Sequence, residues 1–122
     1  MLQMYTLPNS VLTIGKYAFN YISSLTEVIL PNSISSIGER AFSSCANLEK
    51  INIPINVTAL ISTFISCTKL ERVEIPWGVS DLTGTFSSCT NLTEVILTDN
   101  IHTIGDSTFN NCVNLQPFEL PK

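Results

Sequence analysis

Residues 25–47 read LTEVILPNSISSIGERAFSSCAN, and this stretch decides the fold because its pattern recurs along the whole chain. Residues 2–24, LQMYTLPNSVLTIGKYAFNYISS, and residues 92–114, LTEVILTDNIHTIGDSTFNNCVN, align with it without a gap. Two units that are one residue shorter begin at Leu48 and Leu70, and a sixth unit begins at Leu115. Self-similarity at a period of 22 or 23 residues is typical of a solenoid, in which each repeat packs on its neighbours. We therefore expect residues 1–122 to form a single repeat domain.

Each unit opens with spaced apolar residues, for example Leu48, Ile51 and Ile53, followed by Pro54. This pattern predicts a half-buried strand, and strands one repeat apart pair in parallel. The proline removes a hydrogen-bond donor and ends the ladder. The sequence thus predicts a parallel sheet of about five to six short strands, with mostly loop elsewhere and little helix.

A second apolar pair in each unit, such as Ile34 and Ile37, predicts another short extended segment on the opposite wall of the coil. Glycines follow this pair at Gly15, Gly38 and Gly105, where we expect a positive φ or close backbone packing. Aromatic residues then recur at one position, which predicts a stacked core: Phe19, Phe42, Phe64, Phe86 and Phe109.

The succession Leu-x-x-Val-x-Leu-Pro-x-x-Ile-x-x-Ile-Gly-x-x-Ala-Phe-x-x-Cys-x-x-Leu over residues 25–48 resembles the BspA-type leucine-rich repeat, also named after Treponema pallidum repeats. The resemblance covers five complete units and part of a sixth, and Ile22 departs from it where Cys is expected. It implies a right-handed leucine-rich-repeat coil without enzymatic activity or cofactors. Similar proteins lie on the surfaces of host-associated bacteria and some parasitic protists and are linked to adhesion. The resemblance therefore implies protein binding and a cell-surface or secreted location.

Composition narrows the classes of partner. The net charge is −4, and the six basic residues are scattered, which argues against nucleic-acid binding. No apolar run approaches the ~18 residues of a membrane span, and no signal peptide is visible at the N-terminus. Neither end carries a polar capping repeat, so we expect a fragment of a longer array or ends covered by a partner, with homo-oligomers possible.

The residues that suggest chemistry all have a simpler interpretation. One cysteine recurs per repeat, at Cys45, Cys67, Cys89 and Cys112, without a Cys-x-x-Cys pair or a neighbouring histidine. Metal binding is therefore not expected, and buried free thiols are favoured over strained disulfides between neighbours. The single histidine, His102, has no partners for a catalytic triad. No catalytic, cofactor or metal site is predicted.

The outward positions of the strands carry six glutamates against Lys50 and Arg72. One interpretation is a solvated sheet face in which Glu49, Lys50, Glu71 and Arg72 form cross-strand ion pairs. The other is an acidic patch that recognises basic partner segments. The candidate partner-binding residues on this face are Glu27, Ile29, Glu49, Glu71, Arg72, Glu74, Glu94 and Ile96.

Trp77 follows Pro76 at a turn where other units carry Asn or Asp. Because tryptophan is enriched at binding hot spots, Trp77 completes the candidate site. The alternative is local packing beside Ile55. The sequence favours a non-enzymatic protein-recognition module of an adhesion-type surface or secreted protein, with a structural spacer or self-assembling array as the alternative.

Overall fold

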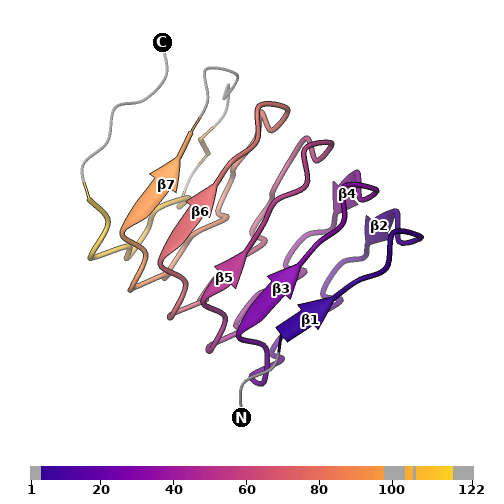
Figure 1. Cartoon of the computed structure of the whole chain (residues 1–122). Helices are drawn as coiled ribbons and strands as arrows, with labels where there is room; N and C mark the ends of the chain where they lie inside the picture. Colours follow the sequence, from indigo (N-terminus) through magenta and orange to yellow (C-terminus); the bar gives the residue numbers. More distant parts are fainter. Residues whose placement is uncertain (1–3, 98–103, 106, 117–122) are drawn as a thin grey trace.

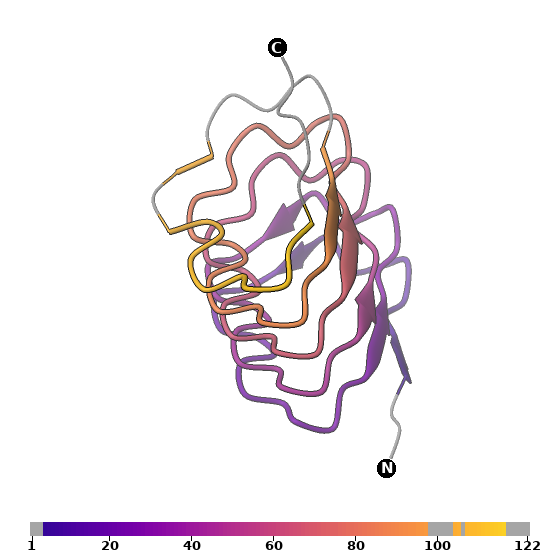
Figure 2. The same ribbon diagram turned by 90° about the vertical axis from the view of Figure 1, so that its left-hand side faces the viewer.

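The structure is a computed structural model that describes residues 4–97, 104–105 and 107–116. The chain coils into stacked rungs, one per repeat, with strands along one wall (Figures 1 and 2). Within the described part there is no helix. Five strands form the strand wall: β1 (Met4–Thr6), β3 (Glu27–Ile29), β5 (Lys50–Ile51), β6 (Arg72–Glu74) and β7 (Glu94–Ile96). The solenoid with short parallel strands is thus confirmed.

The pairing of the strand wall follows the repeat period. β1 pairs with β3 in parallel, with Tyr5 opposite Val28, and β3 pairs with β5, with Val28 opposite Ile51. β6 pairs with β7, with Val73 opposite Val95. The wall therefore consists of a three-stranded and a two-stranded sheet rather than one continuous sheet.

The opposite wall contains the second extended segment that the sequence predicts. β2 (Thr13–Ile14) pairs in parallel with β4 (Ser36–Ile37). In the two shorter repeats this segment is reduced to a single bridge between Ala59 and Asp81. The two repeats that are one residue shorter therefore have less regular strand pairing on this wall than the two repeats that contain β2 and β4.

A third wall consists of turns, and we call it the turn wall. Each rung there holds two residues with positive φ, four positions apart, such as Arg40 with Ser44 and Ser62 with Ser66. This conformation is unusual for residues other than glycine. Backbone N–H groups of this wall donate to carbonyls of the following rung, for example from Ser44 to Ile65 at 2.7 Å. These inter-rung bonds hold the strained turns in register.

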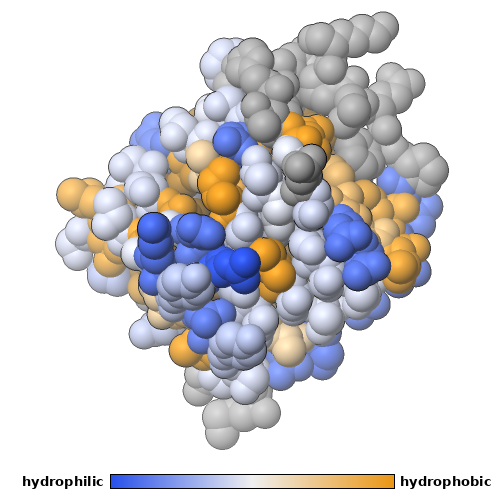
Figure 3. Space-filling view, turned by 180° about the vertical axis from the view of Figure 1, so that it is seen from behind, coloured by the Kyte–Doolittle hydropathy of each residue, from blue (hydrophilic) through white to orange (hydrophobic). Residues whose placement is uncertain are grey.

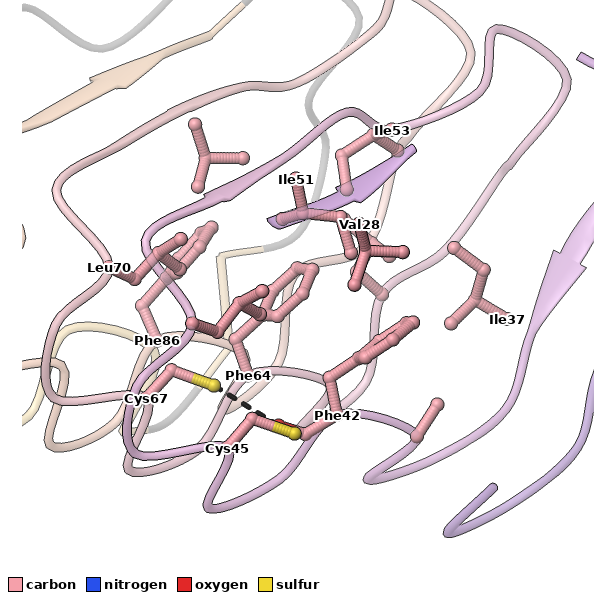
Figure 4. Packing of buried hydrophobic residues seen from close by; sticks show 14 of the residues in the cluster. Val28, Ile37, Phe42, Cys45, Ile51, Ile53, Phe64, Cys67, Leu70 and Phe86 are labelled. Atoms are coloured by element: carbon pink, nitrogen blue, oxygen red, sulfur yellow. Dashed lines mark hydrogen bonds between the residues drawn. The ribbon is translucent and has the colours of Figure 1, made fainter. Parts of the chain in front are cut away.

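The core runs along the solenoid axis as a column of stacked phenylalanine rings (Figure 4). Ring centroids of Phe19 and Phe42 lie 5.1 Å apart, and the next three steps to Phe64, Phe86 and Phe109 are each 5.9 Å. Phe42, Phe64 and Phe86 are completely buried. The predicted aromatic core is therefore present, and offset stacking stabilises each step by about 0.5–1.5 kcal/mol.

All four cysteines are free thiols, and each does more than fill space. The thiol of Cys67 donates to the carbonyl oxygen of Phe42 at 3.1 Å (Figure 4). The other three repeat this bond, from Cys45 to Phe19, Cys89 to Phe64 and Cys112 to Phe86. The free thiols are thus hydrogen-bond donors to core carbonyls, a role that the sequence expectation of buried free thiols did not include.

The expectation for the three glycines is partly wrong. None of Gly15, Gly38 and Gly105 has a positive φ; the glycine that does is Gly84. Close packing holds at Gly38, where an added Cβ would lie 2.5 Å from the Lys16 backbone nitrogen. Glycine is thus required at Gly38 by the approach of the preceding rung.

Candidate functional site

The strand wall is interrupted between β5 and β6, and we call this interruption the seam. At other steps, the N–H that follows the strand donates to the next rung. Leu7 donates to the Ile29 oxygen at 3.3 Å, and Ile75 donates to the Ile96 oxygen at 2.9 Å. The corresponding N–H of Ile53 has no hydrogen-bond partner within the described residues.

The N–H groups just before the strands show the same loss of hydrogen bonding at the seam. The N–H of Glu49 donates to the Thr26 oxygen at 2.8 Å, and that of Thr93 donates to the Glu71 oxygen at 2.9 Å. The equivalent N–H of Glu71 has no partner in the described part of the chain. Because each rung repeats the same geometry, both unpaired N–H groups face the seam.

The interruption is confined to the strand wall. On the turn side the same two rungs are joined by bonds of 2.8–3.0 Å, including those from Phe64 to Thr85 and from Ser66 to Ser87. The two rungs are therefore tightly connected on the turn side while their strands remain unpaired.

Asn52 follows β5 beside the seam, and its side chain bonds toward β3, away from the seam. Its side-chain amide accepts from the Leu30 N–H at 2.7 Å and donates to the Leu30 oxygen at 2.8 Å. Neighbouring rungs use a backbone carbonyl at this position, as Ile29 and Ile96 do. The side chain thus takes the place of the backbone in the bond with β3, and β5 ends at Ile51, one residue earlier than its neighbours.

A groove of about 790 Å³ lies over the strand wall at the seam. Its lining includes buried Val28, Ile51, Ile53 and Ile75 between more exposed polar side chains. Seven of the nine candidate residues line it, namely Glu27, Ile29, Glu49, Glu71, Arg72, Glu74 and Ile96. Trp77 and Glu94 do not line it, although Trp77 directly follows Pro76, which does.

The ion pairs on this face differ from those that the sequence interpretation offered. Arg72 binds Glu74 at 3.0 Å and Glu94 at 3.1 Å, rather than Glu49 or Glu71. Its hydrogen bonds to Glu74 and then Glu94 raise the pKa of Arg72, whose side chain is exposed. Lys50 forms no ion pair within the described residues.

The groove keeps an acidic balance after this pairing. Its lining contains four carboxylates and two cations, a net charge of −2. Glu49 and Glu71 stand at the same position of neighbouring rungs, and both are exposed without an ion-pair partner in the part of the chain described. These two carboxylates therefore remain available to a basic partner group.

The apolar candidates separate into exposed and half-buried residues. Ile29 is 40% exposed, whereas Ile96 is half-buried and accepts the hydrogen bond from Ile75. Trp77 is 67% exposed, and Ile55, at the same position of the preceding rung, is 63% exposed. Most of the indole is therefore accessible, and the two apolar side chains occupy one column beyond the C-terminal ends of β5 and β6.

Other features yield no competing site. Hydrophobic and hydrophilic side chains are interspersed on the opposite face (Figure 3), which is ordinary for a protein surface. No three potential metal ligands cluster within the described residues. His102 lies outside them. No described helix is long and apolar enough to cross a bilayer.

The seam, the role of Asn52 and the exposure of Ile55 are the parts of the site that sequence reasoning missed. The available signal was the isoleucine at Ile55, in a column that holds Asn, Asp and Trp77 in the other complete repeats. Asn52 offered no signal, because its column also contains the polar residues Thr6 and Glu74. The Ile55 signal becomes visible only when the repeats are aligned position by position.

Comparison with known proteins agrees with this architecture. The family described as BspA type leucine rich repeat region matches residues 1–116 as six copies. A leucine rich cell surface protein from Faecalibacterium prausnitzii A2-165 has a similar structure, with 31% identity and a TM-score of 0.84. A leucine rich repeat protein from T. pallidum has 28% identity and a TM-score of 0.86, and one from Bacteroides ovatus has 28% and 0.67. No curated protein sequence matches the chain.

These likenesses each cover 92% of this chain, which spans 30%, 56% and 38% of the respective solved chains. Leucine-rich repeats are protein-interaction modules whose stacked units present extended binding surfaces. With six matching copies over nearly its whole length, the chain belongs to the BspA-type leucine-rich repeat family.

Proposed function

We propose that this chain is a non-enzymatic protein-recognition module within a surface or secreted adhesion-type protein. The observation that carries the proposal is the acidic groove at the seam, with the exposed Trp77 beyond its end. Family membership and the likeness to a cell surface protein of Faecalibacterium prausnitzii support the adhesion role. The partner is a protein, and binding needs neither a cofactor nor membrane insertion.

Recognition combines two physical contributions at this site. Glu27, Glu49 and Glu71 supply a negative potential that attracts and orients a basic partner surface. Trp77 supplies a large apolar surface whose burial stabilises the complex. Arg72, held by Glu74 and Glu94, keeps part of the face ordered and limits which basic groups fit.

Binding to a panel of immobilised purified extracellular proteins tests this proposal. We expect at least one partner whose affinity falls roughly tenfold or more in Trp77→Ala and in the double reversal Glu71→Lys/Glu74→Lys. Tyr21→Ala is the matched control, because Tyr21 is an equally exposed aromatic residue on the turn wall. A partner that binds both site variants like the native chain would place recognition elsewhere.

Self-assembly through the ends of the array is a second candidate function. Tyr5 occupies the core column of Val28 and Ile51 yet is 47% exposed, and Met4 beside it is also exposed. The outer edge of β1 is open in the described structure and is a template for another strand. The apolar residues Leu2, Phe118 and Leu120, near the two ends of the sequence, were also expected to be exposed core residues of an uncapped array, and they lie outside the described residues.

Sedimentation separates this candidate from recognition. Assembly predicts a mass that rises with concentration and returns to that of the monomer in Tyr5→Lys, which places a charge on the open edge. A monomer at all concentrations contradicts assembly and leaves the recognition proposal unaffected.

A further inference from the structure

We infer that the seam binds an extended segment of the partner, with a basic residue at Glu49 and Glu71 and an apolar side chain about five residues away at Ile55 and Trp77. This inference rests on the proposed function and adds the conformation, chemistry and spacing of the bound segment.

The dimensions of the seam set the length of the segment. From Glu49 to Ile55 the backbone advances by six residues, and so does the neighbouring backbone from Glu71 to Trp77. At ~3.3 Å per residue this path spans roughly 20 Å. An extended segment lying along it covers about the same number of residues, and the groove volume of about 790 Å³ is within the usual range of ligand sites.

The acidic end of the groove determines the charge of the segment. Glu49 and Glu71 are adjacent exposed carboxylates without an ion-pair partner within the described residues. Lys50 lies beside them, so one cation faces two carboxylates at this end of the groove. A Lys or Arg side chain of the partner relieves the remaining repulsion and gains charge-assisted hydrogen bonds.

The opposite end determines the apolar residue. Ile55 and Trp77 follow Pro54 and Pro76, where the two strand paths leave the groove. They are adjacent in one column, and both are exposed on at least three-fifths of their surface. A Leu, Ile or aromatic side chain of the partner buries apolar area against both.

The backbone between these ends accounts for an extended conformation. The N–H groups of Ile53 and Glu71 face the seam and have no partner in the described part of the chain. Ile53 also lines the groove, where an unpaired donor costs free energy. A segment that follows the two parallel strand paths along the groove is extended like the strands beneath it.

Two synthetic seven-residue peptides of identical composition test the inference. In the first, a Lys-Arg pair and a leucine are separated by four Thr and Val residues; in the second, the leucine adjoins the basic pair. Each is made in both chain directions and titrated against the full chain by fluorescence anisotropy. We expect one direction of the spaced peptide to bind at least about tenfold tighter than either compact peptide.

Matched variants place the two ends of the bound segment. Glu49→Gln/Glu71→Gln and Ile55→Ser/Trp77→Ala are each expected to weaken the spaced peptide roughly tenfold, and only the first pair is expected to reduce the salt dependence of binding. Glu39→Gln and Tyr21→Ala, on the turn side of the coil, are expected to bind like the native chain. Circular dichroism of each variant verifies that it is folded.

The inference is overturned if no peptide binds, if compact and spaced peptides bind equally, or if the four substitutions leave the affinity unchanged. A protein partner that still depends on Trp77 in the panel experiment would then show that the proposed function stands without this mode of binding. If neither the peptide titration nor the protein panel gave the expected binding, both the inference and the proposed function would be refuted.

Discussion

At the scale of single residues, the cysteine column shows how burial and hydrogen bonding act on one group. Each thiol donates to a phenylalanine carbonyl of the preceding rung, and Cys67 and Cys89 are completely buried. Burial raises the pKa of Cys89 from 9.0 to about 12, and the neighbouring Cys112 adds to the shift. Burial likewise raises the pKa of Cys67 well above 9.0. These thiols are protonated donors at neutral pH.

This shift predicts a loss of stability in alkali. Unfolded Cys89 ionises near pH 9, whereas the folded thiol stays protonated until about pH 12, so ionisation favours the unfolded chain between these values. The free energy of unfolding of the native chain should fall relative to that of Cys89→Ala as the pH rises above 9, by roughly 3 kcal/mol at pH 11. Urea denaturation from pH 7 to pH 11 measures the difference. If the free energies of unfolding of the two proteins changed equally with pH, Cys89 would not be the source of the loss of stability in alkali.

At the scale of elements, two equivalent glycines provide a matched comparison. An alanine Cβ at Gly38 would lie 2.5 Å from the Lys16 nitrogen and 2.6 Å from the Gly15 carbonyl carbon, which are backbone atoms of the preceding rung. At Gly15 the same Cβ meets nothing within 4 Å. We expect Gly38→Ala to lower the free energy of unfolding by about 1–3 kcal/mol and Gly15→Ala to change it by less than about 0.5 kcal/mol. Urea unfolding tests both, and equal effects would contradict the close packing of the two rungs.

The amide of Asn52 predicts a second effect at this scale. Asn52→Ala leaves the N–H and C=O of Leu30 without their partners, which costs about 1–3 kcal/mol. Asn56→Ala is the control, because its bond to the Asn32 oxygen is 3.4 Å long and exposed. Equal stability of the two variants, measured by thermal unfolding, would show that the Asn52 amide does not support β5.

The elements also show what the sequence could predict. Strand positions, the phenylalanine column and the outward face follow from periodicity, because every rung repeats the same environment. The seam does not follow from periodicity, because the missing pairing of β5 with β6 and the side-chain bonds of Asn52 appear only in three dimensions. The pairing of Arg72 was missed for a similar reason: Glu74 lies two residues along the same strand and Glu94 lies directly across on β7. The sequence does not show which of the neighbouring carboxylates Arg72 binds, and the interpretation that paired it with Glu49 or Glu71 was wrong.

At the scale of the whole molecule, stability is expected to vary along the solenoid. Phe64 and Phe86 are completely buried between neighbouring rungs, whereas Phe19 in the first rung is only partly buried and Tyr5 is exposed. Because each rung is stabilised by its neighbours, local opening should need the most free energy in the middle rungs. Hydrogen exchange should therefore be slowest for the turn-wall amides of Phe64 and Ser66 and fastest for those of Phe19 and Tyr21. Uniform exchange along the chain would indicate a single cooperative unit.

The direction of the turn-wall hydrogen bonds has a consequence for synthesis on the ribosome. The N–H groups of Phe19, Phe42 and Phe64 each donate to a carbonyl one rung later in the sequence. A rung that has just left the exit tunnel therefore lacks acceptors until roughly one more repeat has emerged, since chains are made from the N-terminus. Folding of the nascent chain then proceeds in steps of one repeat. A pause in translation would leave the N–H groups of the most recent rung without their carbonyl acceptors.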